Sequence, residues 1–194
     1  MADRRAGPSW VELSVALTAL VVSVASLLVA RHQAQVMDRQ LAAGVWPLLQ
    51  SFTSNLDAQG RPGTATLSVL NAGVGPLRVR SFRVFYQGRP MSGAGALFRA
   101  CCARGDTLHA PPWAESYTYG RVVRPGEQVD YLIVRRDPRM RPDAYEAFER
   151  ARDDIAVRVC YCSVLDDCWV KPADDPEPTP VRSCAAEQKA PQYR

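Results

Sequence analysis

The sequence predicts a mainly β protein, in which one β-sandwich domain follows an N-terminal transmembrane helix and a helical stalk. Three observations predict this class. Residues 10–30 form one long apolar run, residues 45–170 divide into short β-forming runs separated by turn residues, and every cysteine lies beyond the apolar run. With 194 residues and 47% hydrophobic content, the chain has enough apolar residues for one ordinary globular domain and a small extra segment.

Residues 10–30 are predicted to be a transmembrane helix that is not cleaved. At about 1.5 Å per residue, a helix over this run is about 30 Å long, which is enough to cross a bilayer. Its one charge, Glu12, lies near the edge beside Trp10, at the expected headgroup depth. A secretory signal peptide has a shorter apolar region, about 7–15 residues, and ends in a small-residue cleavage site that residues 29–32 do not provide. We therefore expect residues 10–30 to contact lipid.

The orientation of this helix follows from the cysteines, because the basic residues do not decide it. Arg4 and Arg5 precede the span, and Arg31 and Arg39 follow it, so the positive-inside rule gives a tie. Six cysteines, all after the span, are typical of a domain exported to an oxidising compartment. We expect residues 1–9 to be cytoplasmic and the rest of the chain after the span to lie outside.

Residues 31–44 are predicted to continue the helix into water as a stalk. The segment contains no proline and no glycine before Gly44, and Pro47 follows as a helix stop. A narrow apolar stripe runs along it at helical spacing through Ala30, Ala34, Met37 and Leu41. The stripe is compatible with a homo-oligomer through the stalk, although it is shorter than a coiled coil normally needs.

Strands are predicted in the first half of the domain at residues 46–53, 64–70 and 77–86, where β-forming residues lie between turn signals. The apolar parity changes within the third strand, which predicts a bulge near residues 80–81. A structural turn joins the second and third strands, and its two glycines are expected to provide positive φ angles. The turn residues are Asn71, Gly73, Gly75 and Pro76.

The second half is predicted to contain short helices at residues 91–102 and 142–152 and a hairpin formed by residues 116–123 and 128–135. In the hairpin, Val129, Tyr131 and Ile133 are expected to point inward. A last strand over residues 154–164 leads to a proline-rich tail, residues 171–194.

The order of these features resembles that of uncharacterised single-span bacterial envelope proteins. The shared features are the anchor, the stalk, Trp46-Pro47, Asn71-Ala-Gly-Val-Gly-Pro76 and Cys160-Tyr-Cys-Ser-Val-Leu-Asp-Asp-Cys-Trp169. The resemblance implies an immunoglobulin-like β-sandwich with short helical insertions over residues 45–170. It also implies a bacterial inner-membrane protein with a cytoplasmic N-terminus, a periplasmic C-terminal domain and a protein partner in the envelope. It implies no activity.

The cysteines are predicted to form structural disulfides among Cys101, Cys102, Cys160, Cys162, Cys168 and Cys184. A reversal centred on Leu165 places Cys168 opposite Cys162 and predicts a bridge between them, while a one-residue slip would let Cys160 compete. Because Cys101 and Cys102 are adjacent, we expect each to bond outward to a different segment, and Cys184 to tether the tail. Zinc-knuckle spacing is absent, and no helix N-terminus is predicted to lower a thiol pKa.

The sequence predicts no catalytic residue, metal ligand or cofactor. The only two histidines, His32 and His109, are far apart in the chain, and no common hydrolase, metalloprotease or nucleotide-binding motif occurs. A net charge of +4 predicts no nucleic-acid partner. The expected function is that of a membrane-anchored, extracytoplasmic interaction or scaffolding domain. The alternative is a thiol-redox or metal-binding envelope protein that uses the cysteine cluster.

Overall fold

The computed structural model describes residues 10–57, 59–102, 111–137 and 142–193. The expectations for residues 1–9 and for His109 fall outside these ranges. The chain divides into two compact units, Met1–Ala43 and Gly44–Arg194, which are described separately below.

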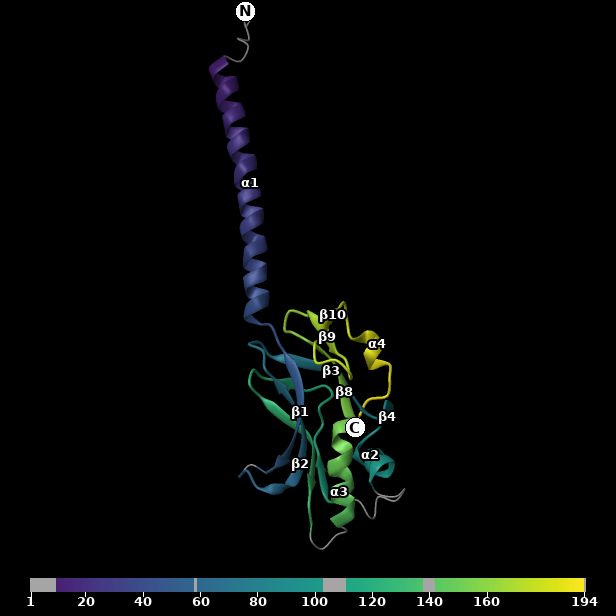
Figure 1. The fold of residues 1–194 in the computed structure, drawn as a ribbon. Helices are drawn as coiled ribbons and strands as arrows, with labels where there is room; N and C mark the ends of the chain where they lie inside the picture. The colour runs from purple at the N-terminus through teal and green to yellow at the C-terminus, as the bar shows by residue number, and fades with distance from the viewer. Residues whose placement is uncertain (1–9, 58, 103–110, 138–141, 194) are drawn as a thin grey trace, which may run out of the picture. The chain divides into compact units, whose positions relative to one another are not determined.

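In the first unit, the predicted span and stalk form one continuous helix, α1 (Trp10–Gly44), with no buried residue (Figure 1). The hydroxyls of Ser14, Thr18 and Ser23 donate hydrogen bonds to carbonyl oxygens one turn earlier, at 2.9, 2.8 and 2.7 Å. These three hydroxyls therefore need no water as a partner. By length and composition α1 is able to cross a membrane, a test that an N-terminal signal sequence also passes.

The second unit contains two antiparallel sheets. The four-stranded sheet has the order β1-β2-β7-β5, and the larger sheet has the order β10-β9-β8-β3-β4, with β6 also paired to β3. The strands of the first sheet are β1 (Leu49–Leu56), β2 (Pro62–Asn71), β7 (Gln128–Arg135) and β5 (Trp113–Glu115). Those of the second are β10 (Thr179–Val181), β9 (Cys168–Lys171), β8 (Ile155–Cys162), β3 (Leu77–Tyr86), β4 (Arg89–Met91) and β6 (Val122–Val123).

The core contains inward-facing side chains from both sheets and from two helices that were predicted from the sequence. These helices are α2 (Ala94–Cys101) and α3 (Pro142–Ala151), and they meet through Phe98 and Phe148, whose ring centroids are 5.5 Å apart. A 3-10 turn (Arg152–Asp154) follows α3, and α4 (Ala185–Gln188) lies near the C-terminus. The helical insertions therefore add large buried aromatic side chains to the sandwich.

Bulges change which side chains face the core. In β3 the pairing with β8 skips Arg80, which confirms the bulge predicted there. In β7, Leu132 pairs with Leu67 and Asp130 with Ser68, so Tyr131 is the extra residue. Beyond it the inward parity shifts to Leu132 and Val134, which are fully buried. The expectation that Ile133 points inward is wrong for this reason.

The predicted hairpin of residues 116–123 and 128–135 is also wrong. Its two halves lie in different sheets, because β6 pairs with β3 and β7 pairs with β2. The turn between them forms as expected, with Gly126 at φ 72° and the Glu127 N–H donating to the Arg124 carbonyl at 3.0 Å. Its backbone also bonds to Asn71, since Gly126 N–H donates to Asn71 O at 2.8 Å. The turn therefore connects the two layers.

Residues 171–194 belong to the second unit and complete its core. Strand β10 extends the larger sheet, and the Tyr193 side chain is 4% exposed. The Tyr193 ring packs against both Phe82 and Tyr131, each with a centroid distance of 6.2 Å, and these two rings contact each other at 5.1 Å. Backbone hydrogen bonding fixes this end, because Tyr193 N–H donates to Phe82 O at 2.9 Å.

A carboxylate in α4 links this tail to the larger sheet. Glu187 accepts two hydrogen bonds from Arg158, at 2.6 and 3.0 Å, and lies 3.7 Å from Arg83. The Arg158 hydrogen bonds are the largest cause that lowers the pKa of Glu187 below its ordinary 4.5. The ionised form is therefore favoured in the folded state.

We expect Glu187→Gln to lower the free energy of unfolding at pH 7 by about 1–3 kcal/mol, since Arg158 loses a charged acceptor. Because the folded-state pKa is depressed, the contribution is complete above about pH 4.5 and is lost as the pH falls through the folded value. Urea unfolding at pH 7 and pH 3 measures the difference. The exposed Glu177→Gln is the matched control, and an equal loss at both pH values would contradict the prediction.

Candidate functional site

The cysteine cluster at the end of β8 is the first candidate site. Cys162 is paired in register with Cys168 across the β8–β9 hairpin, and their Cα atoms are 4.0 Å apart. The Ser163 N–H donates to Asp167 O at 2.8 Å and closes the hairpin. Cys162 and Cys168, the next pair along the strands, therefore form a non-hydrogen-bonded pair, in which the Cα atoms lie closer together. The structure confirms the predicted bridge and its register.

A second bridge joins Cys160 to Cys184, with Cα atoms 5.7 Å apart. Cys160 and Cys162 lie on the same face of β8, as their spacing predicts. Cys184 precedes α4, so this bridge attaches the tail to β8, as expected.

The expectation that Cys101 and Cys102 bond outward is wrong. They bond to each other at the C-terminal end of α2, with Cα atoms 3.7 Å apart. The hairpin brings Cys168 to β8, and the tail brings Cys184 there. The four other cysteines therefore form two disulfides with one another on β8.

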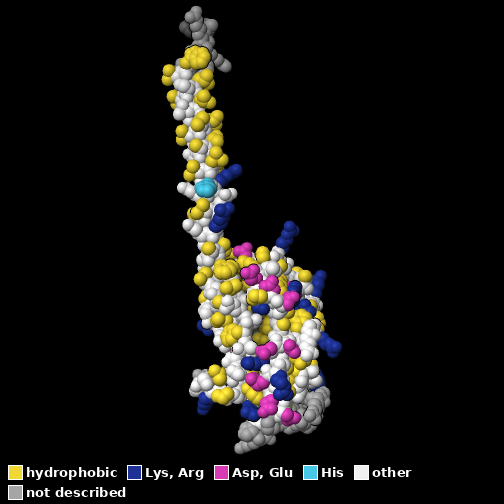
Figure 2. All heavy atoms as spheres, viewed as in Figure 1, with side chains coloured by type: hydrophobic (Ala, Val, Ile, Leu, Met, Phe, Trp, Pro, Cys, Tyr) yellow, Lys and Arg dark blue, Asp and Glu magenta, His cyan; other side chains and the backbone are white. Residues whose placement is uncertain are grey.

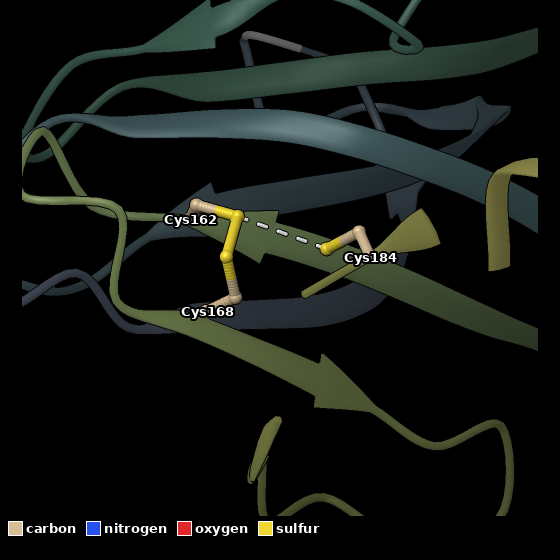
Figure 3. Close-up of side chains that lie close together, drawn as sticks. All are labelled: Cys162, Cys168 and Cys184. Carbon is tan, nitrogen blue, oxygen red and sulfur yellow. Dashed lines mark hydrogen bonds between the residues drawn. A yellow bond between two sulfur atoms is a disulfide. The ribbon is translucent and has the colours of Figure 1, made fainter. Parts of the chain in front are cut away.

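The two bridges on β8 touch each other. Cys162 Sγ lies 3.8 Å from Cys184 Sγ, the contact drawn as a dashed line in Figure 3. Since both sulfurs are in disulfides and carry no proton, this is a van der Waals contact. The sulfurs of Cys162, Cys168 and Cys184 all lie within 4.8 Å of one another. Cysteine binds a metal as the thiolate, so these disulfide-bonded sulfurs offer no metal site while both bridges are intact.

A pocket of about 340 Å³ opens over these sulfurs. Cys162, Cys168 and Cys184 lie in its wall, and Arg80 and Arg182 contribute positive charge. The pocket also contains Asp166, whose carboxylate is paired with Arg78. The sequence places the cysteines together, but Arg80 joins them only because the β3 bulge displaces it from the pairing with β8.

The predicted structural turn has a different basis from the one expected. Neither Gly73 nor Gly75 has a positive φ angle. A Cβ at Gly73 would lie 2.6 Å from Pro47 Cα, and one at Gly75 would lie 2.6 Å from Val45 Cα. The glycines are required because the segment entering the domain passes directly over them.

Asn71 organises this turn through four hydrogen bonds. Its side-chain amide donates to Gly75 O at 2.8 Å and Val123 O at 3.1 Å, and its oxygen accepts from the N–H groups of Leu48 and Gly73 at 3.3 and 3.1 Å. Asn71 is fully buried. Asn71, Gly73 and Gly75 therefore form a structural clasp for the start of the domain, and Pro76 directly precedes β3.

A groove on the outer face of the four-stranded sheet is a second candidate site. Its volume is about 630 Å³, and β1, β2, β7 and the β1–β2 turn provide its walls. Phe52 offers a ring that is 40% exposed, and Asp130 is held by hydrogen bonds from Ser68 and Gln128 at 2.7 and 2.6 Å. The groove is lined by Phe52, Ser54, Leu56, Asp57, Gln59, Arg61, Thr64, Thr66, Gln128, Asp130, Ile133 and Arg135. Sequence reasoning missed it because outward-facing polar residues look like ordinary solvent-exposed positions.

The described carboxyl groups whose pKa is shifted do not favour acid catalysis. The backbone N–H of Arg61 lowers the pKa of Asp57, and that of Arg124 lowers the pKa of Glu127. The pKa of Glu187 is lowered as well, so each of these groups is held ionised, whereas a general acid needs a raised pKa.

Comparison with known proteins adds no activity, since no protein-family description and no curated protein matches this chain.

Proposed function

We propose that this protein is a membrane-anchored, extracytoplasmic interaction domain without catalytic activity. The observation that carries the proposal is an exposed groove on a disulfide-bridged sandwich that is preceded in the chain by a long apolar helix. Such a protein presents its binding surface close to the membrane that anchors it, rather than in free solution.

The sandwich is of the immunoglobulin-like type in this proposal. The orders β1-β2-β7-β5 and β9-β8-β3-β4 correspond to strands A-B-E-D and G-F-C-C′ of that fold. In this assignment α3 lies in the connection between strands E and F.

The anchor is α1, and the compartment is the periplasm of a bacterial cell. Hydrophobic side chains cover the helix over residues 10–30 (Figure 2). Bilayer insertion buries these side chains, which are otherwise exposed to water. The three described disulfides favour an oxidising compartment for the second unit. Residues 1–9 are then cytoplasmic.

A reporter enzyme that is active only in the periplasm should work when it is fused after Arg194 and fail when it is fused before Trp10. The reason is that the disulfides need an oxidising compartment. Because Tyr193 is buried, the C-terminal fusion needs a flexible linker. The reverse pattern of activity would place the cysteines in a reducing cytosol and overturn the orientation.

The interaction itself can be tested with a photo-crosslinking amino acid at position 52, in the groove, in cells that express the full chain. We expect discrete crosslinked products that a second substitution, Asp130→Lys, removes by reversing a charge in the groove. The same probe at exposed Arg89, on β4 in the other sheet, is the control. Equal products at both positions, or products insensitive to Asp130→Lys, would contradict a specific partner at the groove.

A further inference from the structure

The two bridges on β8 contact each other closely enough for thiol–disulfide exchange to take place between them. In that reaction a thiolate attacks one sulfur of a disulfide, and the other sulfur leaves. Cys162 Sγ lies 3.8 Å from Cys184 Sγ (Figure 3). Cys184 is bonded to Cys160. If the bond from Cys162 to Cys168 is opened, the freed Cys162 thiolate is already next to the second bridge.

The first bridge borders the pocket and includes the most exposed of these cysteines. Cys168 is 7% exposed, the largest exposure among these four cysteines, while Cys160 is 1% exposed. The pocket of about 340 Å³ is large enough for a small thiol, and its wall contains Cys168 together with Arg80 and Arg182. These arginines favour an anionic reagent and stabilise a thiolate.

We propose that the two bridges form a disulfide relay that accepts two electrons from a small anionic thiol. The external thiolate attacks Cys168 Sγ, forms a mixed disulfide and releases the Cys162 thiolate. Cys162 attacks Cys184 Sγ, forming a Cys162–Cys184 disulfide and releasing the Cys160 thiolate, which takes a proton. A second external thiol, after losing its proton, attacks the outer sulfur of the mixed disulfide, and the departing Cys168 thiolate is protonated.

The balance is two external thiols oxidised to one external disulfide, while two protein disulfides become one disulfide and two thiols at Cys160 and Cys168. The tail stays covalently attached to β8 throughout, first through Cys160 and then through Cys162, because Cys184 is bonded in both states. The β8–β9 hairpin, in contrast, loses its bridge. This activity is independent of the interaction proposed for the groove and is measured on purified protein.

The test uses the purified full chain in detergent, treated with 2-mercaptoethanesulfonate, acid-quenched, alkylated and mapped as non-reduced peptides. The expected early product contains a Cys162–Cys184 link with Cys160 and Cys168 alkylated. A product in which Cys160–Cys184 is intact and both Cys162 and Cys168 are alkylated would overturn the relay.

The preference for an anionic thiol is tested with neutral 2-mercaptoethanol, which should react more slowly than 2-mercaptoethanesulfonate. Arg80→Gln should remove this difference in rate. An unchanged difference would refute the role assigned to the arginine.

Two single substitutions test the internal step without external thiol. In Cys168→Ser, the free Cys162 thiol should exchange at mildly alkaline pH to give Cys162–Cys184 and a free Cys160. In the matched Cys162→Ser, Cys160–Cys184 should persist and Cys168 should remain free. The same link in both variants would contradict the proposal, and the wild-type mapping decides it if either variant fails to fold.

Discussion

Gly75→Ala is expected to destabilise the domain by about 3 kcal/mol or more, or to prevent its folding. The added methyl group would overlap the Val45 backbone, which belongs to the segment entering the domain. Main chain cannot rotate away as a flexible side chain can, so the overlap has to displace the entering segment or the turn. Displacement would also strain the Asn71 hydrogen bond to the Gly75 carbonyl.

Chemical unfolding of the variant, compared with wild type, measures this loss. Gly44→Ala is the matched control, because it lies next to Val45 in the chain, has no positive φ and has no atom within 4 Å of an added Cβ. We expect the control to change the free energy of unfolding by less than about 0.5 kcal/mol. If Gly75→Ala were as stable as Gly44→Ala, the close contact between Gly75 and the Val45 backbone would not be important for the stability of the domain.

Tyr193→Ala should cost about 3–5 kcal/mol, as expected for truncation of a large buried aromatic side chain. The substitution removes the ring that packs against both Phe82 and Tyr131 and leaves a cavity in the core. Burial raises the pKa of both Tyr131 and Tyr193, which reflects how completely this part of the core is shielded from water.

The loss can be followed by thermal or urea unfolding of the full chain. Tyr117→Ala is the matched control, since Tyr117 is 67% exposed. Its effect should be within about 0.5 kcal/mol. If Tyr193→Ala and Tyr117→Ala were equally mild, the C-terminal residues would be a surface appendage rather than part of the core.

The sequence predicted the features that depend on local pattern. The continuous helix, strand β3 with its bulge, and the Cys162–Cys168 register follow from periodicity and from the strict geometry of a hairpin disulfide. Each depends on residues close in the chain, where alternation and turn residues determine the backbone.

The features that the sequence did not predict depend on distant partners. The bond of Asn71 with the Gly126 turn is one reason why residues 116–135 connect two sheets instead of forming a hairpin. The extra residue at Tyr131 changes the inward face of β7, and alternation alone does not show it. Residues 171–194 were predicted to be a proline-rich tail outside the sandwich, although the last aromatic residue, Tyr193, is buried in the core.

The positions of Cys184 and Tyr193 in the sequence limit when the domain can fold during its synthesis. A ribosome makes the apolar helix before these two residues, so the sandwich lacks part of its core until Cys184 and Tyr193 have been made. Until then Cys160 lacks its native partner, Cys184. A non-native disulfide that involves Cys160 or the nearby Cys162 can form instead. We expect newly made chains to need an oxidant or isomerase that acts after Cys184 has been made. Chains terminated before Cys184 should be degraded by proteases.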